Sequence, residues 1–208
     1  MKPDPGLSVR PGKCRHRKAD MLKSEGALFE FRGPWSVPVQ VGPSILLLFV
    51  LFFGGMPSRE YLGFQLAMVA MLLLSIFLHE FGHAWGALIQ RVPVRRVVLY
   101  GFGGYCEQSR AASPRESELI VAMGPIVTLT LWAVCRLLAN ALMTAGYGAS
   151  PLVWGLNTMA WLNGYLAILN LLPIAPLDGG RLFELVLLRV MPARRAARIA
   201  YDRAGEKR

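Results

Sequence analysis

Long uncharged runs, separated by short charged segments, dominate the hydrophobic pattern of the chain. A helix needs about 20 apolar residues to cross a bilayer. The first uncharged stretch, 33–58, contains Pro38 and Pro43, which should bend or delay the start of a helix. The pattern predicts four membrane-spanning helices, at residues of about 37–56, 61–90, 119–142 and 152–172.

The segment between the second and third predicted spans has a different pattern. Residues 92–100 and Tyr105 flank a glycine-rich sequence, Gly101 to Gly104, and mix β-branched with polar side chains. This pattern indicates a β-hairpin. A shorter apolar run at 182–190 contains two charges and is typical of an interfacial helix. The expected fold class is an all-α polytopic membrane protein with about four transmembrane helices and a small membrane-associated hairpin.

Composition and charge agree with a membrane domain. The chain is 54% hydrophobic, and its mean hydropathy is +0.40. The net charge of +10 would by itself suit nucleic-acid binding. However, residues 1–32 hold eight basic and four acidic residues, and residues 189–208 hold seven and two. Basic residues that flank apolar spans follow the positive-inside rule, so we expect no nucleic-acid partner. We predict a flexible basic tail at 1–32, a membrane domain at 33–190 and a second basic tail at 191–208.

The charge distribution also predicts the topology. Four spans would place both termini on one side, together with the basic loop 91–118. The turns on the other side, near 57–60 and 143–150, contain one basic residue, Arg59. Both termini are therefore expected in the cytoplasm. The arginine-rich composition and the lack of a targeting peptide suggest an integral protein of a bacterial inner membrane.

An HExxH motif, His79 to His83, lies at the end of the second predicted span. This spacing places two imidazoles on one helix face, where both can bind one zinc ion, and Glu80 can take a proton from water. A catalytic zinc usually has three protein ligands. Asp178 ends the fourth span at the same depth, where an acid is hard to explain structurally. We expect one zinc per chain, held near the cytoplasmic side of the membrane.

The chain resembles the site-2 protease family of intramembrane zinc metalloproteases, peptidase family M50. The resemblance covers roughly residues 42–181 and depends on two motifs in the expected order. The first is the HExxH motif on a membrane helix. The second runs from Asn170 to Arg181 and includes Leu177-Asp178-Gly179. Phe102-Gly103-Gly104 and Met123-Gly124-Pro125 resemble family segments that lie between the two motifs, whereas Thr128 stands where the family often has asparagine.

The resemblance implies a role for each of these positions. His79, His83 and Asp178 would bind zinc, and Glu80 would be the catalytic base. Asn170 would help hold the substrate strand or the oxyanion. Gly103 and Gly104 would belong to a membrane-dipping hairpin that admits and orients substrate. An unwound substrate could pair with the edge of that hairpin, which would satisfy its backbone groups. The family cleaves membrane-anchored proteins within or beside a transmembrane segment, often to release a regulator.

The leading hypothesis is a zinc-dependent intramembrane endopeptidase active in regulated intramembrane proteolysis. One alternative is a catalytically silent scaffold of the same fold that binds single-span proteins, although such a protein would be expected to lose one of the four site residues. Another is a zinc carrier, which would need polar groups along a path. The expected partners are a membrane-anchored protein substrate and the lipid bilayer. A regulatory membrane protein and a second copy of the chain are further candidates.

Overall fold

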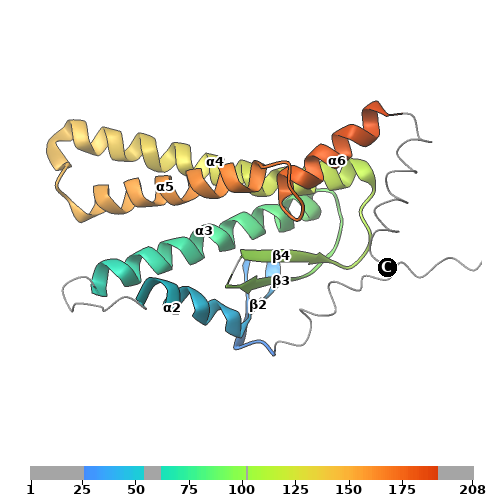
Figure 1. The fold of residues 1–208 in the computed structure, drawn as a ribbon, viewed down its shortest axis with the longest axis horizontal. Coiled ribbons are helices and arrows are strands. Elements are labelled where there is room, and N and C mark those ends of the chain that lie inside the picture. Colours follow the sequence, from blue (N-terminus) through green and yellow to red (C-terminus); the bar gives the residue numbers. More distant parts are fainter. Residues whose placement is uncertain (1–25, 54–61, 102, 192–208) are drawn as a thin grey trace, which may run out of the picture.

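The computed structural model of the protein describes residues 26–53, 62–101 and 103–191. Three long helices lie side by side, and a small sheet packs against one of them (Figure 1). In chain order the elements are β1 (Phe29–Arg32), η1 (Pro34–Ser36), β2 (Pro38–Val41), η2 (Pro43–Ile45), α2 (Leu46–Phe53), α3 (Leu62–Ile89), β3 (Val94–Tyr100), β4 (Gly103–Gln108), α4 (Pro114–Leu142), η3 (Met143–Tyr147), α5 (Pro151–Leu171) and α6 (Asp178–Val190).

Three of the described helices are long and apolar enough to cross a membrane. They are α3 with 28 residues, α4 continued by η3 with 34 residues, and α5 with 21 residues. They correspond to the second, third and fourth predicted spans, which are thereby confirmed as helices of membrane-spanning length. α4 begins at Pro114 because Ser113 and Glu116 form a capping box, in which each side chain bonds the other residue's backbone N–H.

The first predicted span begins too early in the sequence. The count of four spans is not confirmed. The first residues of that predicted span form β2 and then α2. Val37, Val39 and Val41 are buried and alternate with Pro38 and Gln40, which is the period of a strand. The eight described residues of α2 rise about 12 Å, less than half of the roughly 30 Å hydrocarbon core. The predicted end of the span, near residue 56, lies outside the described residues.

The predicted hairpin is part of a larger mixed sheet, so the fold is mostly helical, with a small sheet of four strands, rather than all-α. The strand order is β1-β2-β3-β4. The outer pairs β1–β2 and β3–β4 are antiparallel, and β2–β3 is parallel, with Val39 opposite Val97. β1 is built from residues 29–32, which the sequence pattern had assigned to the flexible tail. β4 forms one edge of this sheet and packs against α3.

A hydrophobic core joins the sheet to α3. Its buried members come from β2, β3, α2, α3 and the residues beside them: Val37, Val39, Val41, Ile45, Leu48, Ile76, Phe81, Ala84, Val97 and Leu99. On the other side of α3, Gly82 and Gly86 allow α4 to come close. A Cβ at Gly82 would lie 2.7 Å from the carbonyl oxygen of Met123. Small residues at such spacing let membrane helices pack backbone to backbone. The HExxH motif is therefore fixed between the sheet and α4.

Candidate metal centre

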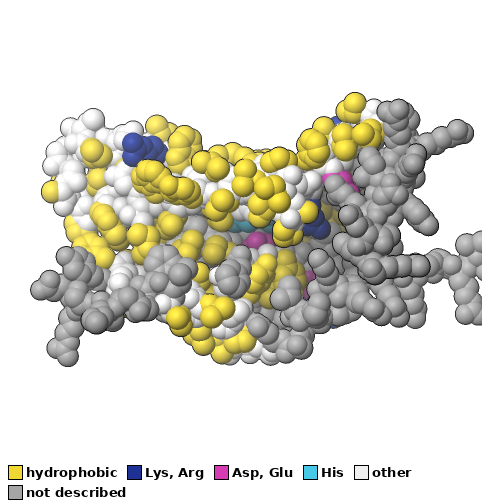
Figure 2. All heavy atoms as spheres, in the orientation of Figure 1, with side chains coloured by type: hydrophobic (Ala, Val, Ile, Leu, Met, Phe, Trp, Pro, Cys, Tyr) yellow, Lys and Arg dark blue, Asp and Glu magenta, His cyan; other side chains and the backbone are white. Residues whose placement is uncertain are grey.

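His79, His83 and Asp178 bring three ligand atoms together although α6 begins 99 residues after His79. The Nε2 atoms of the two histidines are 3.2 Å apart. Oδ2 of Asp178 lies 3.0 Å from Nε2 of His79 and 3.1 Å from Nε2 of His83. In Figure 2, histidine and acidic side chains are visible at the centre of the molecule, in a furrow between the α4–α5 layer and the sheet. Hydrophobic side chains surround them.

The three atoms fit a zinc ion. Nδ1 of His83 lies 2.8 Å from the carbonyl oxygen of Ile120. A carbonyl only accepts, so Nδ1 carries the proton and donates, and Nε2 presents a lone pair. That lone pair faces a carboxylate oxygen, and either a proton on the ring or a metal cation between the two atoms would relieve their repulsion. Ligand atoms about 2.1 Å from a tetrahedral zinc lie roughly 3.4 Å apart, close to the separations found here.

The position of Asp178 depends on the turn between α5 and α6. Gly179 and Gly180 follow it directly, and neither could carry a side chain without a backbone shift. A Cβ at Gly179 would collide with the carbonyl group of Leu171, and one at Gly180 would lie 2.7 Å from that of Ile174. Glycine therefore lets the first turn of α6 pack against the end of α5. This packing aims Asp178 back at α3.

Asp178 is ionised in this setting. Its burial opposes ionisation, but the contacts with His79 and His83 outweigh this and hold the pKa of its carboxyl well below the usual range. A side chain that stays anionic at neutral pH is suited to bind a divalent cation.

Two further glycines make room for the site. A Cβ at Gly124 of α4 would collide with the ring of His83 and would lie 2.9 Å from Cε1 of His79. A Cβ at Gly104 of β4 would lie 2.5 Å from Cγ of Glu80. The sequence pattern gave Gly124 no role at the metal centre. The only indication of its importance in the sequence was its position before Pro125, in a segment that resembles the family.

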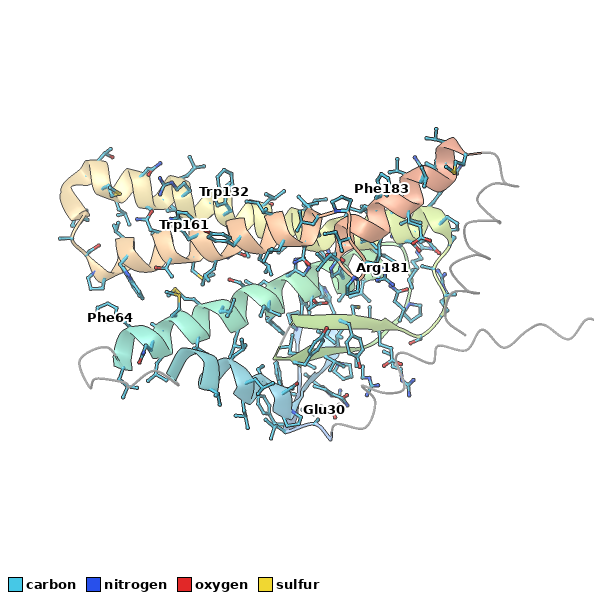
Figure 3. All side chains as sticks on the ribbon, viewed as in Figure 1. Glu30, Phe64, Trp132, Trp161, Arg181 and Phe183 are labelled. Carbon is cyan, nitrogen blue, oxygen red and sulfur yellow. The ribbon has the colours of Figure 1, made fainter. Side chains whose placement is uncertain are left out.

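Glu80 is buried between α3 and the edge strand of the sheet, with 6% of its surface exposed. It is adjacent in sequence to the metal-ligand candidate His79 and contacts the backbone of β4 at Gly104. Arg181, on the first turn of α6, lies between that helix and the sheet (Figure 3). Its positive charge acts on Glu80 across the furrow. The structure thus places a carboxyl group, a basic side chain and three ligand atoms in one furrow.

The remaining predicted residues lie around this cluster without direct bonds to it. Asn170 is half-buried on the last turn of α5, and within the described residues no hydrogen bond joins it to the histidines or to Asp178. Gly103 begins β4 with a φ of +140°, a conformation that favours glycine. Thr128 is fully buried, and its hydroxyl donates to the carbonyl of Pro125 at 3.0 Å, within its own helix.

Comparison with known proteins identifies the family. The sequence model described as Peptidase family M50 matches residues 67–153 and 141–203, which include both the HExxH motif and Asp178. The chain belongs to peptidase family M50, the site-2 protease family. This M50 chain is 26% identical over 174 residues to the zinc metalloprotease MJ0392 of Methanocaldococcus jannaschii, covering 83% of the chain and 48% of that relative.

A second relative of this M50 chain is Rip3 of Mycobacterium tuberculosis. The two are 37% identical over 157 residues, which are 73% of the chain and 39% of Rip3. The chain spans less than half the length of these two relatives. Among solved structures, the site-2 protease from Methanocaldococcus jannaschii matches with a TM-score of 0.61 and 22% identity, over 84% of this chain and 78% of that one. At this identity the match shows a shared fold.

Proposed function

We propose that the protein is a zinc-dependent intramembrane endopeptidase. It hydrolyses a peptide bond within or beside the transmembrane segment of a membrane-anchored protein, in the manner of regulated intramembrane proteolysis. The observation that carries this proposal is the convergence of His79, His83 and Asp178 beside Glu80, in a furrow formed by a helix of membrane-spanning length. Membership of peptidase family M50 supports it.

The metal would be held by Nε2 of His79, Nε2 of His83 and Oδ2 of Asp178, one ion per chain. Zinc in such a site supplies Lewis-acid polarisation of a carbonyl and lowers the pKa of a water molecule to about 7. Neighbouring residues of the chain orient the two histidine side chains. Ile120 fixes the ring of His83, and Gly124 leaves space for both imidazoles.

Glu80 would carry the proton transfers. Its carboxylate takes a proton from the attacking water and afterwards delivers it to the amine that leaves when the peptide bond breaks. It lies one residue from a metal ligand, and its burial keeps bulk water from competing for that proton. Arg181 would offset the negative charge of Glu80 before substrate binds.

The edge strand β4 would hold the substrate. A helical substrate has its backbone groups bonded internally and must unwind before a protease can reach them. An unwound segment could add to β4 as a further strand, at Gly103 and Gly104, because β4 is the outermost strand of the sheet among the described residues. Gly104 contacts Glu80, so a strand paired there would pass directly beside the proposed base. Asn170, on the nearby end of α5, would bind the substrate backbone or the oxyanion.

The membrane setting of the proposal follows from the charge pattern. The protein is an integral membrane protein with three candidate spans. We propose a bacterial inner membrane, with the basic segments 1–32 and 191–208 in the cytoplasm and with β1, from the first of them, joined to the protease domain that continues through 33–190. The metal centre would lie near the cytoplasmic side. A regulatory membrane protein or a second copy of the chain would control access to it.

A direct test uses the zinc-loaded protein in detergent with two synthetic single-span reporters. In one, a Gly-Asn pair interrupts the apolar segment near its cytoplasmic end. In the other, the segment is an uninterrupted helix of matched length. We expect cleavage of the interrupted reporter, because it unwinds more readily, and loss of cleavage on chelation that added zinc restores. Mass spectrometry of the products locates the cut.

Cleavage that persists in chelator would rule out the proposed chemistry. Zinc-loaded, folded protein that binds the interrupted reporter and never cuts it would instead fit a catalytically silent scaffold.

A further inference from the structure

Arg136 is a charge that the proposed protease function does not use. It lies within α4 and is the only Asp, Glu, Lys or Arg between residues 119 and 177. Its Nη1 donates to Oδ1 of Asn157 on α5 at 2.8 Å. In the part of the chain that the structure describes, the guanidinium has no ion pair. A guanidinium has five N–H donors, and leaving such a charge without an anion in hydrocarbon is costly.

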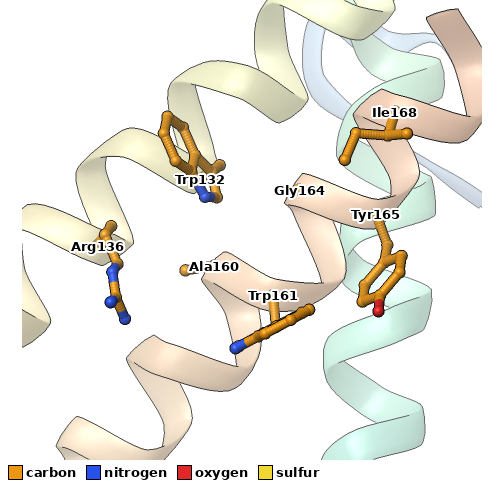
Figure 4. A pocket seen from close by; sticks show the side chains of 7 residues that line it. All are labelled: Trp132, Arg136, Ala160, Trp161, Gly164, Tyr165 and Ile168. Atoms are coloured by element: carbon orange, nitrogen blue, oxygen red, sulfur yellow. The ribbon is translucent and has the colours of Figure 1, made fainter.

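Arg136 borders a groove between α4 and α5 with a volume of about 290 Å³. Three aromatic rings line this groove, those of Trp132, Trp161 and Tyr165, and Ile168 closes one end (Figure 4). Gly164 forms its floor, where a Cβ would lie 3.2 Å from Trp132. The groove faces outward, since the side chains of Trp161 and Tyr165 are 63% and 57% exposed. It is therefore open to the membrane.

The groove lies far from the metal centre along the membrane normal. Arg136 follows Ile120, whose carbonyl binds His83, by 16 residues on the same helix, a rise of about 24 Å. The hydrocarbon core is roughly 30 Å thick. Arg136 is thus in the half of the bilayer opposite to the metal centre. Its long side chain can extend toward the headgroups there.

The groove is polar at the end nearer the membrane surface that lies opposite to the metal centre, and it is apolar at its other end. Arg136 and Asn157 lie toward the far ends of their helices, and Trp161 lies one to two turns further along, at the middle of α5. In Figure 4 the indole nitrogen of Trp161 is on the side of its ring nearer Arg136, so a second donor accompanies the guanidinium. Tyr165 and Ile168 follow toward the end of α5 that precedes α6. A phospholipid has the same order, an anionic phosphate at the surface and an acyl chain below it.

We propose that this groove binds an anionic phospholipid, with its phosphate against Arg136 and an acyl chain along Trp161, Tyr165 and Ile168. The charge pattern argues against a second copy as the occupant. Residues 61–78 and 119–177 contain no acid, so another copy packed here through its own spans would bring no carboxylate to Arg136. A substrate segment would also be about 24 Å from the metal centre.

Fluorescence quenching tests the proposal. The full chain is reconstituted in phosphatidylcholine nanodiscs that contain a small fraction of brominated phosphatidylglycerol or, in parallel, brominated phosphatidylcholine. Bromine quenches tryptophan on contact, so quenching reports which lipid occupies the groove. We expect a roughly fivefold preference for the anionic lipid, which Arg136→Gln abolishes and Arg136→Lys retains. Arg95→Gln, on β3, is the matched control and should leave the preference unchanged.

Two further measurements identify which tryptophans and which part of the lipid cause the quenching. The variant with Trp132→Phe and Trp161→Phe should lose the excess quenching, since the remaining tryptophans lie elsewhere. Added inorganic phosphate should not compete, because the acyl chain contributes to binding. Equal quenching by both lipids, or a preference that survives Arg136→Gln, would overturn the proposal. So would a dimer whose formation removes the quenching, which would make a second copy the occupant.

Discussion

Replacing Glu80 with glutamine is expected to lower the rate of reporter cleavage by about 10²–10⁴-fold while zinc remains bound. Glutamine has nearly the same shape and fits between α3 and Gly104 as the glutamate does. It cannot take up a proton, so the water is not activated and the leaving amine is not protonated. The three ligand candidates are untouched, so the metal content should not change. The measurement is initial cleavage rate and zinc per chain on the same preparation.

The matched control is Glu30→Gln on β1, at the opposite edge of the sheet, which removes an exposed carboxylate that accepts a hydrogen bond from Gln40. Its cleavage rate should stay near that of the unaltered protein. A Glu80→Gln protein that still cleaves at the original rate would show that another group transfers the proton. Loss of zinc from this variant would show instead that Glu80 helps to hold the metal.

The substitution Gly124→Ala is expected to weaken zinc binding by about 10–100-fold or more, although no ligand changes. A methyl group at this position collides with the ring of His83 and crowds that of His79. Both imidazoles must then move away from Asp178. Alanine is the better helix former by about 1 kcal/mol, so a simple loss of helix stability is not expected. Titration with a zinc-sensitive dye measures the affinity.

Gly155→Ala in α5 is the control for Gly124→Ala, because a Cβ at Gly155 has nothing within 4 Å. It should bind zinc as tightly as the unaltered protein. Unchanged zinc affinity in Gly124→Ala would mean that the imidazoles do not occupy the positions described.

The three long helices could be predicted from the sequence because their signal is local. Each is an apolar run of about 20 residues or more, and a helix satisfies every backbone group within such a run in a membrane. The beginning of α4 was missed by five residues. Its capping box at Ser113 and Glu116 lies in the polar loop, where the hydrophobic pattern carries no information.

The sheet was only partly predictable because strand pairing is not local. β3 and β4 are joined by a short glycine turn and were expected as a hairpin. β2 also has alternating β-branched residues, Val39 and Val41, which continue the pattern begun by Val37 just before it, but the strand lies inside an uncharged stretch that resembles the start of a span. Its parallel partner β3 comes more than 50 residues later. The local pattern thus gave no reason to choose a strand over a helix.

At the site, the histidine pair follows from helix geometry, since residues four apart share one face. Asp178 could be suggested by membrane depth, and the structure brings it within 3.1 Å of both rings. The features that hold the three together were not predictable. Gly124, Gly179 and the carbonyl of Ile120 act through close packing between helices, which the sequence does not reveal. The catalytic roles themselves remain predictions.

The most direct test of the central claim is the zinc content of the purified protein beside that of Asp178→Ala. Zinc per chain would be measured by atomic emission on detergent-purified samples whose folding is checked by circular dichroism. We predict about one zinc per unaltered chain and its loss from the variant, because Asp178 supplies the third ligand. A folded Asp178→Ala protein that keeps its zinc, or an unaltered protein that binds none, would contradict the proposed metal centre.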